Sequence, residues 1–312
     1  MALRIDSITV ERDDGRSLVI GPSSRWRLAF GGLDGFDGLD REISVRDYAQ
    51  YDGARETGAR VPAKDRTVSA IGLGEPASLR AEAEAFFVAG RSYTVHVEAE
   101  GRRRMSRAEH YGLHLATDNA TGHQLLDWTF MSLDPYWLGE DERGYDVAEA
   151  VGGFGFPFMS LAEPWELPAQ LASSEAGDGA IDYLIGGFVA GVLSHRVEMR
   201  NEGGATAYPR FVISATGEVV RPSVAVYDSD GDEVCRFGVA VTLEAGDELV
   251  IDFSARPTTI ALNGVNVSNM ALPGSTLATG IEPGTFELEW SAESGDAAMS
   301  VKPYIRDRFV TI

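Results

Sequence analysis

Three histidines lie close together in the sequence, at a spacing that could bind a metal ion. His110 and His114 are four residues apart, and His123 follows them. On a helix, an H-x-x-x-H pair with a third ligand would make a plausible zinc site. The surrounding residues favour a strand instead, in which residues four apart are separated by about 13 Å. We therefore expect strand and turn histidines here, with a zinc site as the less favoured alternative.

Carboxylates could support two further kinds of chemistry. Asp228, Asp230 and Asp232 alternate along the chain and resemble the start of a calcium-binding loop. Such a loop also needs a glycine at a set position and a distal bidentate glutamate, and both are missing. We favour a charged hairpin tip over a weak surface calcium site. Two carboxylates facing each other in a cleft could also make a glycosidase, but nothing in the sequence selects one pair among 48 acidic residues.

The only basic cluster of the chain is rich in arginine. It lies between Glu100 and Arg107 and contains four arginines. Nucleic-acid binding would require interleaved aromatic residues or a larger basic field. Arginine binds carboxylates through two parallel hydrogen bonds. In an acidic protein we therefore expect this cluster to pair with carboxylates of an adjacent subunit.

Motifs of the common enzyme classes are absent from the sequence. It has no G-x-S-x-G, no phosphate-binding loop, no dinucleotide fingerprint and no Cys–His signature. We therefore expect no enzymatic activity, no cofactor and no metal.

The charge of the chain is strongly negative and unevenly distributed. The 312 residues carry a formal net charge of −21. Residues 1–140 contain 17 basic and 22 acidic side chains, and the remaining residues contain 10 and 26. A surface this acidic repels phosphate backbones, so we expect no nucleic-acid partner. High solubility is the simplest consequence, and a specific basic partner is the alternative.

Neither export nor membrane insertion is expected. Arg4 and Asp6 come before any apolar run, which argues against a secretory signal. The uncharged run at residues 183–194 is too short to span a bilayer. The single cysteine, Cys235, lies in a strand-like segment and is expected to be buried. These features are typical of a protein made in a reducing cytoplasm.

The length of the chain favours two domains. Residues 1–139 are predicted to form a β-rich domain with one helix over residues 76–89, because Pro76 suits a first helical turn and the apolar residues share one face. Residues 140–312 are predicted to form an antiparallel β-sandwich, since strand-like segments recur about every ten residues after Gly191. Within them, residues 140–190 are interpreted as a linker with one or two edge strands.

Between these strands, residues 41–72 are predicted to form a long projecting hairpin. Its first strand runs from about Arg41 to Tyr48, and its return strand from about Asp65 to Gly72. The residues between them are too polar to form a core. A two-stranded ribbon is marginally stable alone, and its open edges can pair with another chain. We expect this arm to dock on a neighbouring subunit, so assembly is the first functional hypothesis.

Several segments, in this order and spacing, resemble the distal tail protein family of bacteriophages with long, non-contractile tails. They are GGLDGFDG after Trp26, the polar hairpin with Tyr51–Gly53, the return strand 66–72, the helix 76–89, the strand end Phe130–Tyr136, the segment from VEMRNEGG to AVYD, and the segment from GVNVSN to FELEW. Residues 140–190 are longer and more acidic than a minimal linker in that family.

This resemblance implies a ring of six copies at the far end of a tail tube. The N-terminal domains would form the ring, with each arm around the next subunit, and galectin-like C-terminal sandwiches would project outward. Implied partners are the tail-tube protein, tail hub or tape-measure-associated proteins, and receptor-binding or baseplate proteins. The location would be the tail tip of the virion, after synthesis in the host cytoplasm.

The arm and the basic cluster supply the expected oligomer contacts, which are Arg46, Tyr48, Tyr51, Asp52, Arg55, Arg60, Arg66, Arg102, Arg103 and Arg104. The alternative function is a carbohydrate-binding module, free-standing or as a secondary role in host-surface binding. It would need exposed aromatic platforms, for which the candidates are Trp137 and Trp165.

Overall fold

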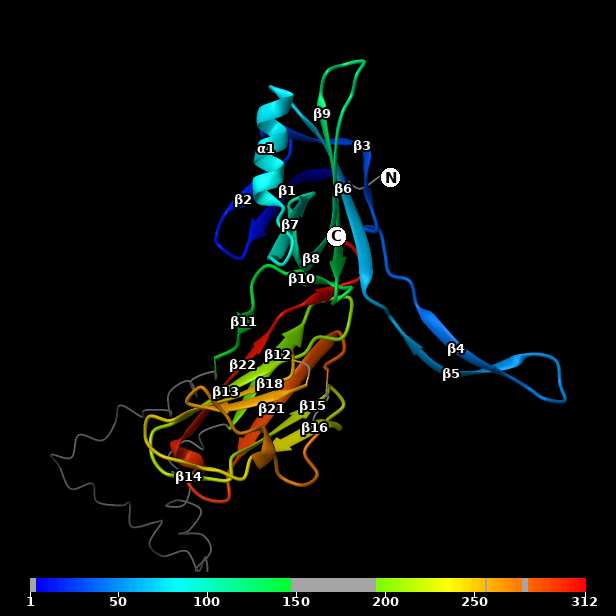
Figure 1. The fold of residues 1–312 in the computed structure, drawn as a ribbon. Coiled ribbons are helices and arrows are strands. Elements are labelled where there is room, and N and C mark those ends of the chain that lie inside the picture. Colours follow the sequence, from blue (N-terminus) through cyan, green and yellow to red (C-terminus); the bar gives the residue numbers. More distant parts are fainter. Residues whose placement is uncertain (1–3, 147–194, 256, 277–279) are drawn as a thin grey trace, which may run out of the picture.

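A computed structural model of the chain describes residues 4–146, 195–255, 257–276 and 280–312. These residues form two β-rich lobes and a two-stranded arm that projects from the first lobe (Figure 1). The first lobe contains residues 5–139 apart from the arm, together with residues 308–312. The second lobe contains residues 143–305, and the arm comprises residues 42–60. The expected fold class is confirmed, because β-strands dominate the described residues and only one α-helix accompanies them.

The first lobe is built on one sheet that closes on itself. Nine strands lie in the order β23-β10-β8-β7-β1-β2-β3-β6-β9, and β9 pairs with β8 as well as with β6. Their bounds are β1 (Ile5–Arg12), β2 (Ser17–Ile20), β3 (Trp26–Asp34), β6 (Lys64–Gly72), β7 (Ser92–Ala99), β8 (Arg102–Thr117), β9 (Gln124–Ser132), β10 (Trp137–Gly139) and β23 (Arg308–Phe309). The parallel contact between β2 and β3 is a single residue pair, Ile20 with Trp26.

The inner face of this closed sheet carries large apolar side chains. Along β9 the buried positions alternate with half-buried ones, as the two-residue period of a strand requires. Leu126, Trp128 and Phe130 are all fully buried. The rings of Trp128 and Phe130 stack at 4.6 Å. The core of the first lobe therefore lies inside the closed sheet.

Helix α1 (Pro76–Phe86) covers one side of the first lobe (Figure 1). Its buried face is Leu79, Ala83 and Phe86, as predicted. The helix was expected to reach residue 89 but ends three residues earlier. Phe87 leaves the helical conformation with φ −87° and ψ 87°, and its ring packs 4.7 Å from that of Trp128. Packing of Phe87 on the sheet thus ends the helix.

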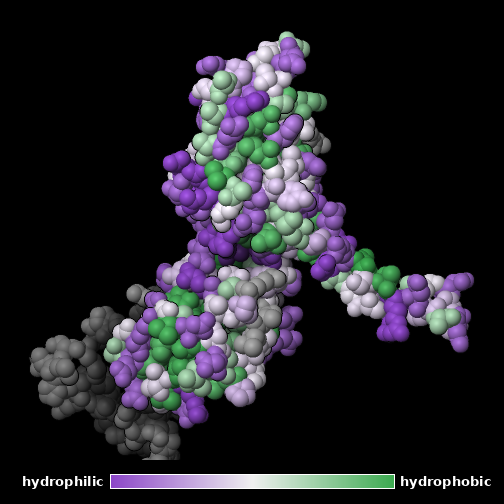
Figure 2. Space-filling model, in the orientation of Figure 1, coloured by the Kyte–Doolittle hydropathy of each residue, from purple (hydrophilic) through white to green (hydrophobic). Residues whose placement is uncertain are grey.

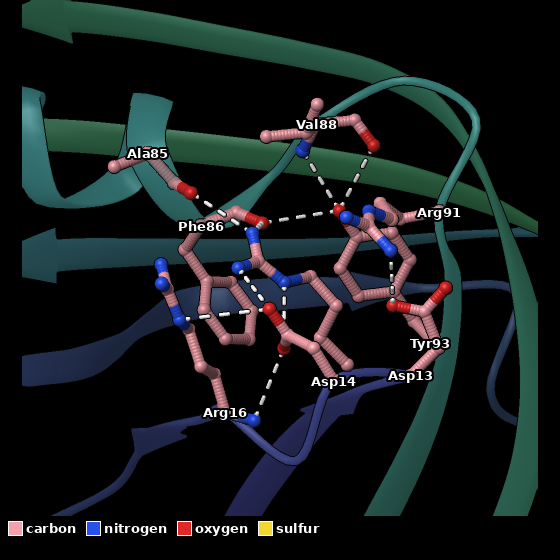
Figure 3. Close-up of polar contacts among 9 residues, drawn as sticks. Asp13, Asp14, Arg16, Ala85, Phe86, Val88, Arg91 and Tyr93 are labelled. Carbon is pink, nitrogen blue, oxygen red and sulfur yellow. Dashed lines mark hydrogen bonds and ion pairs between the residues drawn. The ribbon is translucent and has the colours of Figure 1, made fainter.

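Arg12, the last residue of β1, links the turn between β1 and β2 to the C-terminal end of α1 (Figure 3). Arg12 Nη2 and Nε donate to the two carboxylate oxygens of Asp14 at 2.6 and 3.0 Å. Arg12 Nη1 donates to the carbonyl oxygens of Ala85 and Phe86 at 2.9 and 2.8 Å. A cation is favoured at the negative end of a helix. The hydrogen bonds from Arg12 hold the pKa of the Asp14 carboxyl well below its usual range.

A buried arginine lies beside the root of the arm. Arg66 is 1% exposed, and its guanidinium donates to Ser106 Oγ at 3.0 Å, to Ser132 Oγ and to the carbonyl oxygen of Pro135 at 2.6 Å. It also lies 4.2 Å from the ring centroid of Trp137. Burial lowers the pKa of Arg66 to about 10, because desolvation disfavours the charged form. The expectation that Arg66 contacts another subunit is therefore corrected, since its side chain is satisfied inside its own lobe.

The second lobe is an antiparallel sandwich, as predicted. One sheet has the order β11-β22-β13-β18-β19-β20, and the other has the order β12-β21-β15-β16. Phe211 of the first of these sheets and Phe237 and Leu288 of the second share one core, in which each is fully buried. Cys235 is buried in the same core.

The elements of the second lobe are β11 (Arg143–Gly144), β12 (Arg196–Asn201), β13 (Arg210–Ala215), β14 (Val219–Val220), β15 (Ser223–Tyr227), β16 (Glu233–Gly238), β17 (Thr242–Leu243), β18 (Glu248–Asp252), β19 (Thr259–Leu262), β20 (Val265–Asn266), β21 (Gly284–Ser291) and β22 (Met299–Ile305), with short 3₁₀ turns η1 (Ser268–Met270) and η2 (Asp296–Ala298). Strands β14 and β17 pair separately. Most of the expected linker, residues 147–190, lies outside the described residues.

The end of the chain returns to the first lobe, which differs from the expected division at residue 139. Strand β23 pairs with β10, and Ile312 is buried in the first-lobe core. Arg308 Nη2 donates to Asp134 Oδ1 at 2.5 Å, and its Nη1 donates to the carbonyl oxygen of Thr206 at 2.9 Å. Arg308 on the last strand therefore contacts both lobes.

The arm is a hairpin of β4 (Glu42–Asp47) and β5 (Ala54–Arg60). The first strand was predicted correctly, but the return strand was not. Residues 54–60 were assigned to a polar connection, whereas they form β5; residues 64–72 form β6, between β3 and β9 of the closed sheet. The physical reason is burial, because Arg66, Val68 and Ala70 alternate toward the interior. Such alternation is typical of a half-buried sheet strand rather than a free ribbon.

Replacing Asp14 by asparagine should lower the midpoint of thermal unfolding at neutral pH, because Arg12 loses its charged partner. A carboxyl with a lowered pKa in the folded state stabilises the fold above the pKa of the unfolded chain, about 3.9. The midpoint difference between wild type and Asp14→Asn should therefore be full above about pH 5 and shrink below about pH 4. Circular dichroism melts across this range measure it.

Asp13 offers a matched control for this experiment. Its carboxylate lies 3.5 Å from Arg91, and both side chains are substantially exposed. Asp13→Asn should change the midpoint much less than Asp14→Asn. Equal effects at the two positions would contradict the role assigned to the Arg12 contacts.

Replacing Arg66 by methionine keeps a long side chain and removes the guanidinium. Ser106, Ser132 and the carbonyl of Pro135 then lose a buried donor, so the free energy of unfolding should fall by about 2–4 kcal/mol. Urea unfolding measures this, with the exposed Arg107→Met as control, expected within about 0.5 kcal/mol of wild type. Unchanged stability combined with lost self-association would instead make Arg66 an interface residue.

Candidate assembly interface

Every residue of the arm is exposed in the single chain. Strands β4 and β5 pair with each other and with no further strand of the described residues. Figure 2 shows the arm reaching away from both lobes, with hydrophobic as well as hydrophilic residues along it. A ribbon of two strands without a covered face is marginally stable in water. Among the described residues, the arm is therefore the element that most needs a partner surface.

One face of the arm is apolar. Ile43 and Val45 lie two residues apart on β4, so they share a face, and they are 53% and 62% exposed. Ala59 lies directly opposite Ile43, and Glu56 lies opposite Val45. The carboxylate of Glu56 is 3.1 Å from Arg41 Nη2, which balances its charge within the arm. The result is a short apolar stripe that another surface can bury.

The opposite face of the arm is charged. Glu42 and Arg60 lie opposite each other and form an ion pair at 2.9 Å. Four residues farther along β4, Arg46 lies directly opposite Arg55. Both residues were predicted to contact a neighbouring subunit, and the hairpin brings them together. The charged face thus has a neutralised pair at its root and a like-charged pair toward its tip.

The tip of the arm carries the remaining predicted contacts. Tyr48, Tyr51 and Asp52 are exposed, with the two tyrosines at 48% and 78%. The N–H of Tyr48 donates to the carbonyl oxygen of Gly53 at 3.2 Å, and Gly53 has φ +98°, which favours glycine. The turn is thus closed by its backbone, and its aromatic side chains are available to a partner.

The arginines of the basic cluster on β8 differ in their surroundings, because some contact other parts of the chain and others are exposed to solvent. Arg103 Nε lies 3.4 Å from a carboxylate oxygen of Glu140. The guanidinium of Arg104 lies 3.4 Å from the ring centroid of Phe309, and burial lowers the pKa of Arg104. Arg102 is exposed. Arg104 is thus half-buried against the last strand of its own chain, and the pairing of this cluster with another subunit stays a prediction.

The two candidate sugar contacts have different outcomes. Trp137 is fully buried, where it packs 5.3 Å from the ring of Phe36 and under Arg66. It therefore offers no platform to a ligand, and this expectation is corrected. Trp165 lies outside the described residues.

The histidines belong to the sheet. His110 Nδ1 accepts a hydrogen bond from the indole N–H of Trp128 at 3.1 Å, and burial lowers the pKa of His110. His114 lies on β8 opposite Asp127, and His123 lies in the turn before β9. Within the part of the chain that the structure describes, no three His, Cys, Asp or Glu side chains gather as metal ligands.

The acidic run at residues 228–232 forms a hairpin tip between β15 and β16. Asp228 Oδ1 accepts hydrogen bonds from the N–H groups of Asp230 and Asp232 at 3.0 and 2.9 Å. A hollow of about 260 Å³ beside this tip is lined by Asp228 and Glu282 among others. Glu282 accepts a hydrogen bond from Thr206 Oγ1 at 2.8 Å. Both carboxylates therefore have local structural partners.

The apolar contribution of the arm was missed when its interface residues were chosen from the sequence. Ile43 and Val45 alternate with polar neighbours, and that signal was visible, but only polar and aromatic residues were selected. Phe30 was also missed; it is fully exposed on β3, next to Gly31 and Gly32, where the pairing with β6 is irregular.

Among the described residues, no helix has the length and apolar character needed to cross a bilayer.

Comparisons with known proteins give matches in structure only. No family model and no curated protein matches the sequence. The crystal structure of the SPP1 Dit protein, a paradigm of the hub adsorption apparatus in phages infecting Gram-positive bacteria, matches with TM-score 0.64 at 15% identity, over 97% of this chain and 99% of that chain. A phage P2 baseplate structure in its activated conformation with Ca matches with TM-score 0.52 at 10% identity, over 100% of both chains. The corresponding structure with Sr has the same TM-score and identity, over 98% of this chain and 99% of that chain.

At these identities the likeness is one of fold. It extends over nearly the whole chain and over nearly the whole of each matched chain. The resemblance inferred from the sequence is thus confirmed at this level: the protein has the fold of the SPP1 Dit hub protein.

Proposed function

We propose that this protein is a structural component of a phage tail tip. Six copies form a ring that joins the tail tube to the tail hub and the host-attachment apparatus. Its partners are copies of itself, the tail-tube protein, tail hub or tape-measure-associated proteins, and receptor-binding or baseplate proteins. It acts in the virion after synthesis in the host cytoplasm, and it has no catalytic role.

The observation that carries this proposal is the exposed arm. All of its residues are exposed in the single chain, and its apolar stripe, Ile43 and Val45, is left uncovered. A projecting element that binds a different surface of an identical copy makes a head-to-tail contact, and such contacts close into rings when the rotation between copies permits. The arm thus supplies the kind of contact that a ring requires.

The fold likeness supports the same role. The matched proteins are a hub protein of a phage adsorption apparatus and a phage baseplate component, and each is covered almost completely. The second lobe, as a galectin-like sandwich, would project from the ring toward the host-attachment proteins. Sugar binding is proposed as a secondary role, to which Trp137 does not contribute because it is buried in the core of the first lobe.

Deletion of the arm tests the proposal. Glu42 and Arg60 are directly paired, so residues 43–59 can be replaced by an Asn-Gly turn that closes a short hairpin. Wild type should form particles of six times the chain mass in mass photometry and rings in electron micrographs, and the variant should be monomeric. It should still unfold in one cooperative transition, because the arm buries no core residue, and its midpoint should lie below that of wild type by the amount that assembly stabilises the folded chain.

A control variant receives the same turn at another exposed hairpin. Residues 229–231, at the tip between β15 and β16, are replaced by Asn-Gly, and this variant should still form rings. A wild-type protein that remains monomeric at high concentration, or an arm-deleted variant that still forms rings, would contradict the proposal.

A further inference from the structure

Two arginines of the arm lie in an arrangement that is unfavourable for the free chain. Arg46 and Arg55 occupy directly opposite positions on β4 and β5, and both are exposed. Within the described residues neither takes part in an ion pair or a side-chain hydrogen bond. Two arginines at the root of the arm do have partners within the chain: Arg41, just before β4, pairs with Glu56 at 3.1 Å, and Arg60 pairs with Glu42 at 2.9 Å.

Like charges directly opposite each other destabilise a strand pair. In a chain with 27 basic and 48 acidic side chains, carboxylates able to neutralise them are plentiful. Strands β4 and β5, on which Arg46 and Arg55 lie, nevertheless project away from both lobes (Figure 1). An anionic group placed between the two guanidinium groups would convert their repulsion into attraction to a shared partner.

We propose that Arg46 and Arg55 form a clamp that binds a carboxylate of a second copy of this chain. This inference rests on the proposed function, because it requires the arm to lie on a neighbouring subunit. Charge complementarity identifies the occupant, since the net charge of each copy is −21. Arginine suits the task because its planar guanidinium donates two parallel hydrogen bonds to a carboxylate.

The two faces of the arm then have separate roles. Burial of Ile43 and Val45 stabilises the contact without fixing its orientation, because the hydrophobic effect is non-directional. The clamp, in contrast, selects one register of the arm on its neighbour. Binding through Arg46 and Arg55 should weaken as salt is added, because salt screens charges that are still partly exposed. Contacts made by the apolar stripe should not weaken in this way.

Chemical cross-linking tests the clamp and identifies its partner. The variant Arg46→Lys/Arg55→Lys keeps both charges and introduces amines that a carbodiimide couples to adjacent carboxylates. Chains labelled with nitrogen-15 and unlabelled chains are mixed under dissociating conditions, assembled and cross-linked. Mass spectrometry should then find mixed-label peptides joining position 46 or 55 to an Asp or Glu. Lys64, whose amine lies 2.6 Å from Asp40 of the same chain, should give same-label links and confirms the coupling chemistry.

Neutral variants give an independent measurement. Arg46→Gln/Arg55→Gln should raise the concentration at which half of the rings dissociate by about tenfold or more, and this shift should shrink at high salt. Arg60→Gln removes one charge from the same face, but its partner Glu42 belongs to its own chain, so its effect should be severalfold smaller.

The outcomes separate the two proposals. If wild type forms rings and deletion of the arm abolishes them, the proposed function stands. In that case, cross-links confined to one label, or an Arg46→Gln/Arg55→Gln variant that assembles like Arg60→Gln, would show that the clamp is wrong while the ring is right. If wild type forms no rings, both proposals fail together.

Discussion

The proposed assembly depends on a two-stranded ribbon, the arm, which has no core of its own. Strands β4 and β5 pair with each other along one edge, but none of their side chains is buried in the single chain. Hydrophobic burial is the dominant favourable contribution in folding and in most protein association, so the arm cannot obtain that contribution alone. The surrounding fold can be understood as the support for this exposed element, which no other part of the described residues covers.

That support begins at the root of the arm. Arg66 lies two residues after the first residue of β6 and is bonded to Ser106 on β8, Ser132 on β9 and the carbonyl of Pro135. Asp134, next to Pro135, accepts a hydrogen bond from Arg308 on the last strand, and Arg308 also bonds the carbonyl of Thr206 in the second lobe. The contacts of Arg66 and of Arg308, which meet at the neighbouring residues Pro135 and Asp134, therefore link β6, the strand that follows the arm, to the closed sheet and the sandwich.

Side chains that suggested chemistry have structural roles instead. His110 accepts a hydrogen bond from the buried indole of Trp128, and Asp228 caps the backbone of a hairpin tip. Arg104 packs on Phe309 near the end of the chain. In each case the residue type permits a ligand role, while the strand or turn in which it lies gives it a partner within the same chain. Residue type and spacing alone were therefore poor guides to function.

The sequence by itself determined the all-β class, helix α1, the sandwich and the existence of a projecting hairpin, because these follow from local alternation and turn residues. It also contained the apolar alternation of Ile43 and Val45. Only the tertiary structure decided that residues 54–60 form the return strand, that Arg66 and Trp137 are buried, and that the last strand crosses back to the first lobe. These depend on pairings between residues far apart in the chain, on which local pattern carries no information. The opposition of Arg46 and Arg55 has the same origin, since the register of β4 with β5 places them face to face.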